Sequence, residues 1–401
     1  MNKTENKLVP ELRFPEFMND GDWESKSFEK LLEIGNGRDY KHLDQGDIPV
    51  YGSGGYMLSV NNYLYNGESV CIGRKGTIDK PMFLTGKFWT VDTLFYTHSF
   101  NNCQPKFIYY IFQNIDWLKH NEAGGVPSLS KANIYKIKTA IPELKEQKKI
   151  ADCLSSLDEA ISVHSDKLEA LKNHKKGLLQ NLFPQEGETV PKYRFPEFKN
   201  DGDWEENKLE NYINLFSGIA LKSEEITDNE SGVPILRGIN ITEGYIRHSK
   251  DIDKYFLGKI ENLERFFVKE NDIVIGMDGS KVGKNVALIR KEDENSILIQ
   301  RVARIRTNKN SDTHFIYQYF KSDKFRNYVD TVNTSSGIPH ISAQQIKDFK
   351  AGIPPKLKEQ QKIADCLSEV DNLITAQADK IEQLKAHKKG LMQQLFPQLK
   401  A

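Results

Sequence analysis

The chain has 401 residues, and its 56 basic and 56 acidic residues give a formal net charge of zero. The length predicts two or three domains rather than one core. The zero net charge counts against a protein that binds nucleic acid through a uniformly basic surface, and any such protein would need its basic residues gathered locally. The polar stretch Met1–Pro10, the lack of ~20 consecutive apolar residues and four cysteines without a CxxC pair predict a soluble, cytoplasmic protein without disulfides or structural zinc.

The first feature in chain order is a short block that occurs twice. Arg13–Phe17 and Asp20–Glu24 return with the same letters 181 positions later, as Arg194–Phe198 and Asp201–Glu205. Repetition over a long period is typical of a duplicated structural unit. The block therefore predicts a chain of two similar halves.

Behind the first block, short runs of β-branched and aromatic residues separated by Gly, Asn and Asp predict strands. Ser69–Ile72 and Phe88–Tyr96 are examples, and Lys106–His120 has the spacing of a helix. The loop Val126–Ser130 precedes a plausible short helix that Ser130 could cap. These elements predict a mixed α/β domain.

A long helix is predicted next, delimited by Pro142 and Pro184. From Ile150 to Leu182, apolar residues recur at alternating steps of four and three, interrupted by polar residues at His164 and Lys175. This heptad spacing is typical of a coiled coil, in which polar core residues fix the register.

The second half repeats this plan with different residues. Strands are predicted at Ile273–Ile275 and Ile297–Ile305, a helix at Thr313–Val329, and a matching loop at Ser336–Ser342. The helix block that begins at Leu144 returns 213 positions later, so the second domain carries about 30 extra residues.

The two long helices either cover their own domains or pack on each other. A helix that only packs on its own domain would need an apolar stripe of two or three turns. The heptads extend over roughly nine turns, which favours packing of the two helices on each other. Parallel and antiparallel pairs both fit, and an antiparallel pair is favoured because each helix leaves its own domain. We therefore predict an α+β fold with a pseudo-two-fold internal repeat, with mixed α/β domains at residues 1–142 and 186–354 and long helices at residues 143–185 and 355–401.

The order of domain, helix, domain and helix resembles the specificity subunits of type I restriction-modification enzymes. The motifs that carry the resemblance are the RFPEF and DGDWE segments, the LKEQ and KIAD segments of each helix start, the HKKGL and LFP segments of each helix end, and the VPSLS and IPHIS loops. The resemblance extends from about Val9 to Pro397, and its motifs are specific for the family's scaffold and not for a DNA target.

The resemblance implies two target-recognition domains joined by two conserved helices that pack antiparallel. It implies double-stranded DNA as the ligand, and two methyltransferase (modification) subunits and motor-nuclease subunits as partners. These partners, and not this chain, would carry out adenine methylation and ATP-dependent cleavage. Because the two domains differ in sequence and length, we expect an asymmetric bipartite target with one half-site for each domain.

Recognition of a DNA sequence needs side chains with paired donors or acceptors, and loops whose glycines let the backbone come close. Arg304 and Arg306 stand two apart and so share one face of a predicted strand. By this composition, the candidates are Arg38, Tyr40, Lys41, Ser53, Gly54, Arg74, Lys75, Ser128 and Lys131 in the first domain, and Lys222, Arg237, Asn240, Ser280, Lys281, Lys284, Arg304, Arg306 and His340 in the second.

Each candidate also fits a solvated surface turn. Ser130 and Ser342 fit helix caps, and the loops that contain them also fit phosphate contacts through helix amides and Lys131. His340 is disfavoured as a metal ligand or catalytic base because no second His or Cys has a suitable spacing.

Motifs for catalysis are missing from the sequence. Gly279–Asn285 lacks the spacing of a phosphate-binding loop and predicts a hairpin turn, and there is no HExxH, GxSxG or Asn-Pro-Pro-aromatic motif. We therefore expect no cofactor, no metal site and no catalytic activity of the chain itself. Two other hypotheses remain: a coiled-coil scaffold without direct DNA contact, and a self-contained DNA methyltransferase or nuclease, which the missing motifs disfavour.

Overall fold

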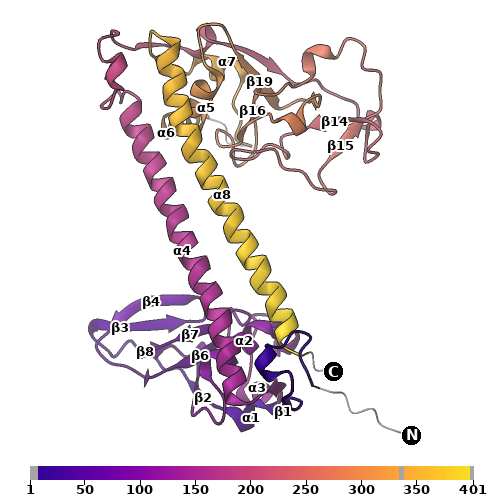
Figure 1. Cartoon of the computed structure of the whole chain (residues 1–401). Coiled ribbons are helices and arrows are strands. Elements are labelled where there is room, and N and C mark those ends of the chain that lie inside the picture. The colour runs from indigo at the N-terminus through magenta and orange to yellow at the C-terminus, as the bar shows by residue number, and fades with distance from the viewer. Residues whose placement is uncertain (1–7, 334–337, 398–401) are drawn as a thin grey trace. The chain divides into compact units, whose positions relative to one another are not determined.

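The computed structural model describes residues 8–333 and 338–397 (Figure 1). Met1–Lys7, and Ser336 and Gly337 of the second predicted loop, lie outside the described residues. The chain divides into two compact units: unit 1 comprises residues 1–167 and 377–401, and unit 2 comprises residues 168–376. Among the described residues, no helix is long and apolar enough to cross a membrane.

Two helices of 39 residues each, α4 (Leu144–Leu182) and α8 (Leu357–Leu395), contribute one segment to each unit. Each begins two residues after a proline, Pro142 or Pro355, and ends two residues before another, Pro184 or Pro397. Proline cannot continue a helix because it has no N–H and its ring meets the preceding turn.

Unit 1 has two four-stranded sheets in its described part, ordered β2-β9-β6-β7 and β4-β3-β8-β5, and a separate β1-β10 pair. The long β3–β4 hairpin stands out in Figure 1. The elements are β1 (Glu24–Ser27), α1 (Phe28–Leu31), β2 (Glu33–Asn36), β3 (Gln45–Gly52), β4 (Gly55–Val60), β5 (Tyr65–Asn66), β6 (Ser69–Gly73), β7 (Met82–Leu84), β8 (Lys87–Thr90), β9 (Leu94–His98), α2 (Pro105–Asn114), α3 (Lys131–Lys136) and β10 (Lys138–Ile141).

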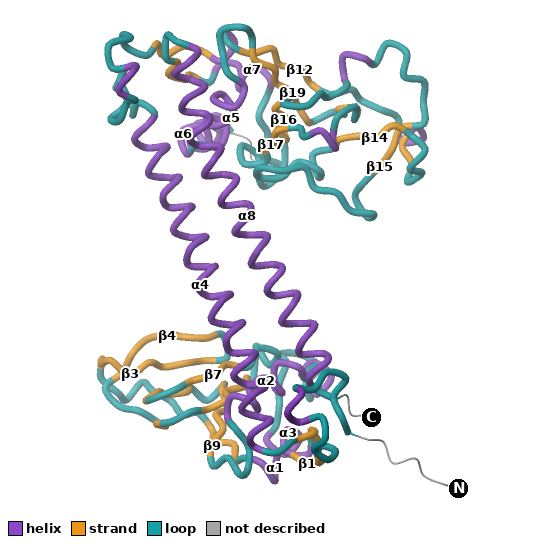
Figure 2. Tube along the Cα trace, viewed as in Figure 1, coloured by secondary structure: helices purple, strands orange, loops and turns teal. Residues whose placement is uncertain are grey.

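Over the residues that the structure describes, unit 2 matches two of the sheets of unit 1, with the orders β12-β19-β16-β17 and β11-β20. Its third sheet, β13-β15-β14-β18, shares the order of three strands with β4-β3-β8, but its fourth strand differs, because β13 pairs with β15 whereas β5 pairs with β8. Its region around β14 and β15 consists mainly of loops (Figure 2). The elements are β11 (Glu205–Lys208), β12 (Ile213–Ser217), β13 (Ile226–Thr227), β14 (Val233–Leu236), β15 (Lys254–Phe256), β16 (Ile273–Gly276), β17 (Val286–Leu288), β18 (Ile297–Leu298), β19 (Val302–Thr307), α5 (Thr313–Lys321), α6 (Asp323–Val332), α7 (Ala343–Asp348) and β20 (Lys350–Ile353). The structure thus confirms an α+β protein with two repeated domains.

Two strands predicted as single runs are each divided by a turn. The run Phe88–Tyr96 becomes β8 and β9, and Ile297–Ile305 becomes β18 and β19. In both units the strand before the turn belongs to one four-stranded sheet and the strand after it to the other. Residues on both sides of each turn are buried, so apolar residues continue across it. Hydrophobic periodicity therefore does not indicate where one strand ends and the next begins.

Both predicted helices in the domains are also divided. Lys106–His120 becomes α2 and a 3-10 turn, because Ile115 adopts an extended conformation. Thr313–Val329 becomes α5 and α6, and the hydroxyl of Ser322 accepts a hydrogen bond from Phe325 N at 3.3 Å, which caps α6.

The repeated sequence blocks contact each other within each unit, which explains why they recur together. In unit 1 the guanidinium of Arg13 donates to both carboxylate oxygens of Glu146 on α4, at 2.8 and 2.7 Å. In unit 2 Arg194 makes the same two contacts with Glu359 on α8, at 2.7 and 2.8 Å. Both carboxylates are buried, and the bidentate pairs anchor each opening segment to the start of a long helix.

Replacing Glu359 by Ala is expected to destabilise the protein strongly, because Arg194 would then be buried without its partner. Removing one partner of a buried ion pair costs about 3–5 kcal/mol. Urea unfolding followed by circular dichroism measures the change in the free energy of unfolding. Lys362→Ala, which removes an exposed pair with Glu197, is the control and should change stability much less; equal stability of the two variants would contradict this role of Glu359.

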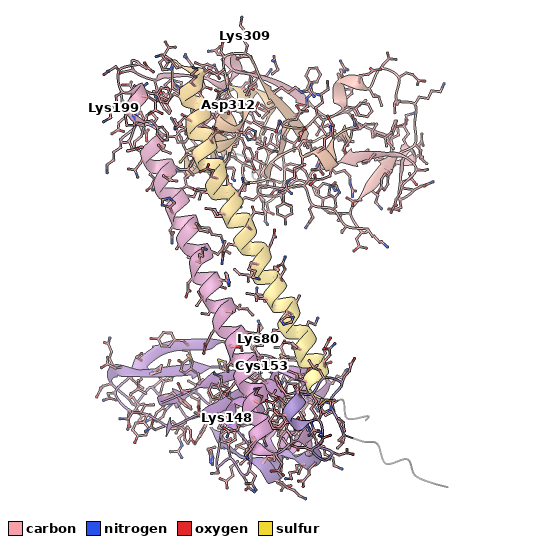
Figure 3. All side chains as sticks on the ribbon, in the orientation of Figure 1. Lys80, Lys148, Cys153, Lys199, Lys309 and Asp312 are labelled. Carbon is pink, nitrogen blue, oxygen red and sulfur yellow. The ribbon has the colours of Figure 1, made fainter. Side chains whose placement is uncertain are left out.

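The glutamine after each of these glutamates fixes the start of the next domain helix. Gln147 Oε1 accepts from Gln104 N at 2.9 Å before α2. Gln360 Oε1 accepts from Asp312 N, also at 2.9 Å, before α5. Asp312 is labelled in Figure 3. Each long helix therefore sets the position of one helix in the domain that precedes it.

Charged residues join α4 and α8 inside each unit. In unit 2 Lys175 Nζ lies 2.7 Å from Asp371 Oδ1, and in unit 1 the repeat counterpart Lys388 Nζ lies 2.6 Å from Asp158 Oδ1. Burial lowers the pKa of Lys175 to about 8, and the nearby Lys321 cation acts in the same direction. Lys175, predicted as a polar residue among the heptads, thus contacts the other long helix.

His164 and Gln377, which occupy the same place in the two repeats, contact each other in unit 1. Gln377 Nε2 donates to the carbonyl oxygen of His164 at 2.8 Å and lies 2.6 Å from its Nδ1. An amide donor facing Nδ1 requires that nitrogen to act as the acceptor. The second polar position of the heptad pattern therefore also joins the two helices.

Candidate nucleic-acid interface

Three loops of unit 1 meet where strands end. They are residues 73–76 after β6, 91–93 between β8 and β9, and 126–129 before α3, and we call them the three-loop cluster of unit 1. The middle loop carries the chain from one sheet to the other. Loops held by a rigid scaffold are the usual place for contacts with a ligand.

Backbone hydrogen bonds hold these loops together. Arg74 N donates to Thr93 O at 2.8 Å, and Leu129 N donates to Arg74 O at 2.9 Å. Lys75 and Ser128 form an antiparallel bridge. The side chains of Arg74 and Lys75 are exposed, whereas Ser128 is half-buried. Three sequence candidates from two distant segments are thus brought side by side.

Two further candidates lie against this cluster. A Cβ at Gly37 would lie 1.9 Å from the carbonyl oxygen of Val91, so only glycine fits there. Arg38 follows directly, and its side chain is exposed. A Cβ at Gly76 would lie 3.2 Å from Ser53 Oγ, which places the β3–β4 turn beside the cluster.

Lys131 adds charge to the same region but has a structural contact of its own. Its Nζ donates to the carbonyl oxygen of Ile34 at 2.5 Å. Burial lowers the pKa of Lys131, and the nearby Arg74 cation acts in the same direction. Ser130 Oγ accepts from Asn133 N at 3.2 Å and so caps α3, as one of the two interpretations of this loop predicted.

The remaining candidates of unit 1 lie farther along its loops. Lys41 and Gly54 are exposed, Gly54 in the β3–β4 turn. Tyr40 is half-buried and packs against a small core cluster that contains Val50 and Trp89. The structure therefore gathers Arg38, Ser53, Arg74, Lys75, Ser128 and Lys131 and leaves Tyr40, Lys41 and Gly54 around this group.

Unit 2 has a cluster with the same backbone contacts. Its loops are residues 276–279 after β16, 299–301 between β18 and β19, and 338–341 before α7, and we call them the three-loop cluster of unit 2. Met277 N donates to Arg301 O at 2.9 Å, and the N–H of residue 341 donates to Met277 O at 2.8 Å.

The bridge of unit 1 also has its counterpart, since Asp278 and His340 form an antiparallel bridge. The two clusters therefore share a backbone arrangement but not their side chains. Residues that make the same backbone contact in the two clusters occupy equivalent positions. Arg74 is equivalent to Met277, Lys75 to Asp278, Thr93 to Arg301 and Ser128 to His340.

The loop predicted as a hairpin turn is confirmed as one, because the strands on its two sides, β16 and β17, pair antiparallel. It carries Ser280, Lys281 and Lys284, whose side chains are all exposed beside the cluster of unit 2. His340 is exposed as well. In the part of the chain that the structure describes, no group of three or more His, Cys, Asp and Glu side chains is arranged to hold a metal ion.

Lys222 and Arg237 lie elsewhere in unit 2. Lys222 is exposed next to a 3-10 turn, and its Nζ lies 3.9 Å from Glu224. Arg237 follows β14 and is half-buried, and its guanidinium donates to the carbonyl oxygen of Ile252.

The expectation that Asn240 contacts DNA needs correction. Its side chain is fully buried, its Oδ1 accepts from Arg237 N at 3.1 Å, and its Nδ2 lies 3.2 Å from both Arg247 O and Asp253 Oδ1. A buried amide with these partners organises the loop after β14 and is not available to a base.

The expectation that Arg304 contacts DNA also needs correction, although Arg304 and Arg306 do share one face of β19 as predicted. Arg306 contacts both carboxylate oxygens of the buried Asp272, at 2.5 and 2.8 Å. Arg304 is 6% exposed and donates to the carbonyl oxygens of Arg265 and Phe267. The guanidinium of Arg304 serves the fold, because a buried cation needs such partners. The Arg306 side chain is 36% exposed beside its ion pair with Asp272.

One residue near the cluster of unit 2 was missed from the sequence. Arg301 is in the turn between β18 and β19, and its Nη1 lies 2.8 Å from Asp278 Oδ2. The segment Ile297–Ile305 was interpreted as one strand, in which Arg301 has no special place. The Gln300–Arg301 pair within an otherwise apolar run is the signal that could have indicated the turn.

Comparisons with known proteins agree with this arrangement. The family model of the type I restriction modification DNA specificity domain matches residues 20–173 and again residues 201–386. The type I restriction enzyme MjaVIII specificity subunit of Methanocaldococcus jannaschii is 28% identical over 341 residues, which cover 82% of this chain and 76% of that protein. The EcoAI specificity subunit of Escherichia coli is 31% identical over 215 residues, which cover 53% of this chain and 34% of that protein.

A solved structure shows the same fold. The crystal structure of the type I restriction-modification system S subunit from M. genitalium has a TM-score of 0.69 at 15% identity, and the alignment covers 98% of this chain and 100% of that chain. Each of the two matched segments contains one three-loop cluster and part of one long helix. The chain therefore belongs to the type I restriction modification DNA specificity domain family.

Proposed function

We propose that the chain is the DNA-specificity subunit of a type I restriction-modification complex and recognises an asymmetric bipartite target. The observation that carries the proposal is the pair of three-loop clusters, which have the same backbone hydrogen bonds but different side chains. A shared backbone would present each cluster to DNA in the same way. Different side chains at equivalent positions would then select different bases.

Residues 1–142 and 186–354 act as the two target-recognition domains in this proposal. In unit 1 the positions that face DNA are Arg38, Ser53, Arg74, Lys75, Ser128 and Lys131, with Tyr40, Lys41 and Gly54 nearby. In unit 2 they are Ser280, Lys281, Lys284 and His340, with Lys222 and Arg237 at a greater distance in the chain. Local groups of cations would meet the phosphate backbone despite the zero net charge of the chain.

The long helices, assigned to residues 143–185 and 355–401, serve as spacers that pack antiparallel in a coiled coil with a pseudo-two-fold axis. Support comes from the contacts inside each unit, where Lys175 joins Asp371 and Lys388 joins Asp158. Lys175, near the end of α4, pairs with Asp371, nearer the start of α8. Asp158, nearer the start of α4, pairs with Lys388, near the end of α8. An antiparallel pair of helices requires this order. A 39-residue helix is about 58 Å long at ~1.5 Å per residue, enough to hold two half-sites apart.

Catalysis belongs to partner subunits in this proposal. The relatives are named as specificity subunits, and the sequence carries no catalytic motif. Two methyltransferase subunits would add methyl groups to adenines at sites that this chain selects, and motor-nuclease subunits would cleave DNA with ATP, in the cytoplasm. The chain itself would need no cofactor.

Filter binding of labelled DNA tests the proposal directly. The isolated chain is expected to bind DNA weakly because its net charge is zero, and affinity should rise sharply when a cognate methyltransferase subunit is added. With that subunit present, the double variant Arg74→Ala and Lys75→Ala should lose most binding, because two exposed cations leave the cluster.

The double variant Lys30→Ala and Lys138→Ala removes the same charge from exposed positions in α1 and β10 of unit 1 and is the matched control. Its binding should remain close to that of the unchanged protein. Equal loss in both variants would indicate a general charge effect, and no specific binding in any complex would favour a scaffold that does not contact DNA.

A further inference from the structure

The turn that holds Arg301 has a backbone that most residues avoid. Arg301 has a φ of 68°, in the left-handed region, where a Cβ is unfavourable. The carbonyl of the same residue accepts the hydrogen bond from Met277 N that builds the three-loop cluster of unit 2. The side chain itself is 66% exposed. The fold therefore fixes the backbone of this arginine while its guanidinium faces solvent.

An ion pair with Asp278 also holds the guanidinium of Arg301. Asp278 Oδ2 lies 2.8 Å from Arg301 Nη1, and the Asp278 side chain is 21% exposed. Exposed ion pairs add little to stability, so this pair is better explained by orientation of the arginine. The contact with Asp278 engages Nη1 and not the edge formed by Nε and Nη2.

That edge matches one DNA base in particular. A guanidinium presents two parallel N–H groups, and guanine in the major groove presents the O6 and N7 acceptors at the spacing that these groups need. A carboxylate that already holds the guanidinium reduces the rotamer freedom that is lost on binding. The equivalent position of unit 1 is Thr93, which cannot make this bidentate contact.

We propose that Arg301 recognises a guanine in the half-site of unit 2, and that Asp278 is the positioning residue for this contact. The proposal rests on the proposed function and deepens it, because it names one base and the side chain that selects it. It also predicts that the half-site of unit 1 has no guanine selected by a bidentate contact from the equivalent position, Thr93.

The test uses the complex of the full chain with its methyltransferase subunits and a DNA library that is randomised across both half-sites. Sequencing of the methylated fraction gives the base preference at every position. Arg301→Ala should reduce the preference for G·C at one position of one half-site by on the order of tenfold to a hundredfold. The other half-site should be unchanged, and thermal unfolding should match that of the unchanged protein.

Three further variants make the result specific. Arg301→Lys should not restore the guanine preference, because an ammonium offers no paired donors. Asp278→Ala should weaken the same preference by a smaller factor. Arg290→Ala removes another exposed arginine of unit 2, whose Nη1 lies 3.7 Å from Glu292, and should leave every preference unchanged.

A full guanine preference in Arg301→Ala would overturn the proposal. So would weaker methylation of all sequences alike with a shallower dependence on salt, which is the behaviour of a phosphate contact. If the unchanged protein selected no sequence at all, the proposed function would fail, and this inference with it. Loss at one G·C pair with the other half-site intact supports both.

Discussion

Exchange of residues 22–141 for the equivalent segment of a relative is expected to change one half-site of the target and leave the other as it was. The segment contains the whole three-loop cluster of unit 1 and stops before α4. Arg13 and Glu146, whose ion pair joins the opening segment to α4, both lie outside the exchanged segment. Gln104, which lies inside it, contributes only its backbone N–H to the contact with Gln147. A donor segment should therefore fold onto the same helix.

Methylation of a library with both half-sites randomised measures this result. The reciprocal exchange of the second domain, within residues 203–352, is the matched control and should change the other half-site. Altered bases in both half-sites, or in neither, would show that the two units do not recognise DNA independently.

Insertion of one heptad into each long helix is expected to change the spacing between the half-sites without changing their bases. The insertions go between Leu168 and Leu171 in α4 and between Ile381 and Leu384 in α8. Seven residues keep the heptad positions in phase, so the helices should still pack. The Lys175–Asp371 and Lys388–Asp158 pairs lie beyond the insertion points and can persist, while the His164–Gln377 contact is lost.

The added length is about 10 Å, or roughly three base pairs, and the two domains would also be rotated relative to the DNA groove. Methylation should move to targets with a longer gap, or cease if the rotation cannot be absorbed. Insertion of three residues at the same places is the control, which breaks the heptad phase and should lower the melting temperature markedly. Methylation of the original target with unchanged spacing by the heptad variant would rule out the spacer role.

The two repeated domains and the long helices could be predicted because their signals are long and redundant. Arg13 and Glu146 recur as Arg194 and Glu359, and each pair forms a buried ion pair. The repetition of these residues in both halves therefore has a structural cause. The heptads extend over most of each helix, and their polar positions, His164 and Lys175, each contact the partner helix.

The candidate interface was harder to predict because charge and glycine do not reveal burial. Arg304 looks like a DNA contact in the sequence, yet its side chain is buried and donates to the carbonyl oxygens of Arg265 and Phe267. Asn240 is likewise buried in a loop that its own amide organises. Arg301 was missed because the apolar residues on both sides of it predict one strand, whereas the chain changes from one sheet to the other at Gln300–Arg301.

Mapping of methylated adenines in the genome of cells that carry the complete system, with and without this chain, tests the central claim most directly. We expect methylation that depends on the chain, at a sequence with two different half-sites separated by a fixed gap of unspecified bases. A single continuous or palindromic sequence, or methylation that persists unchanged without the chain, would contradict the account of two different recognition units on one subunit.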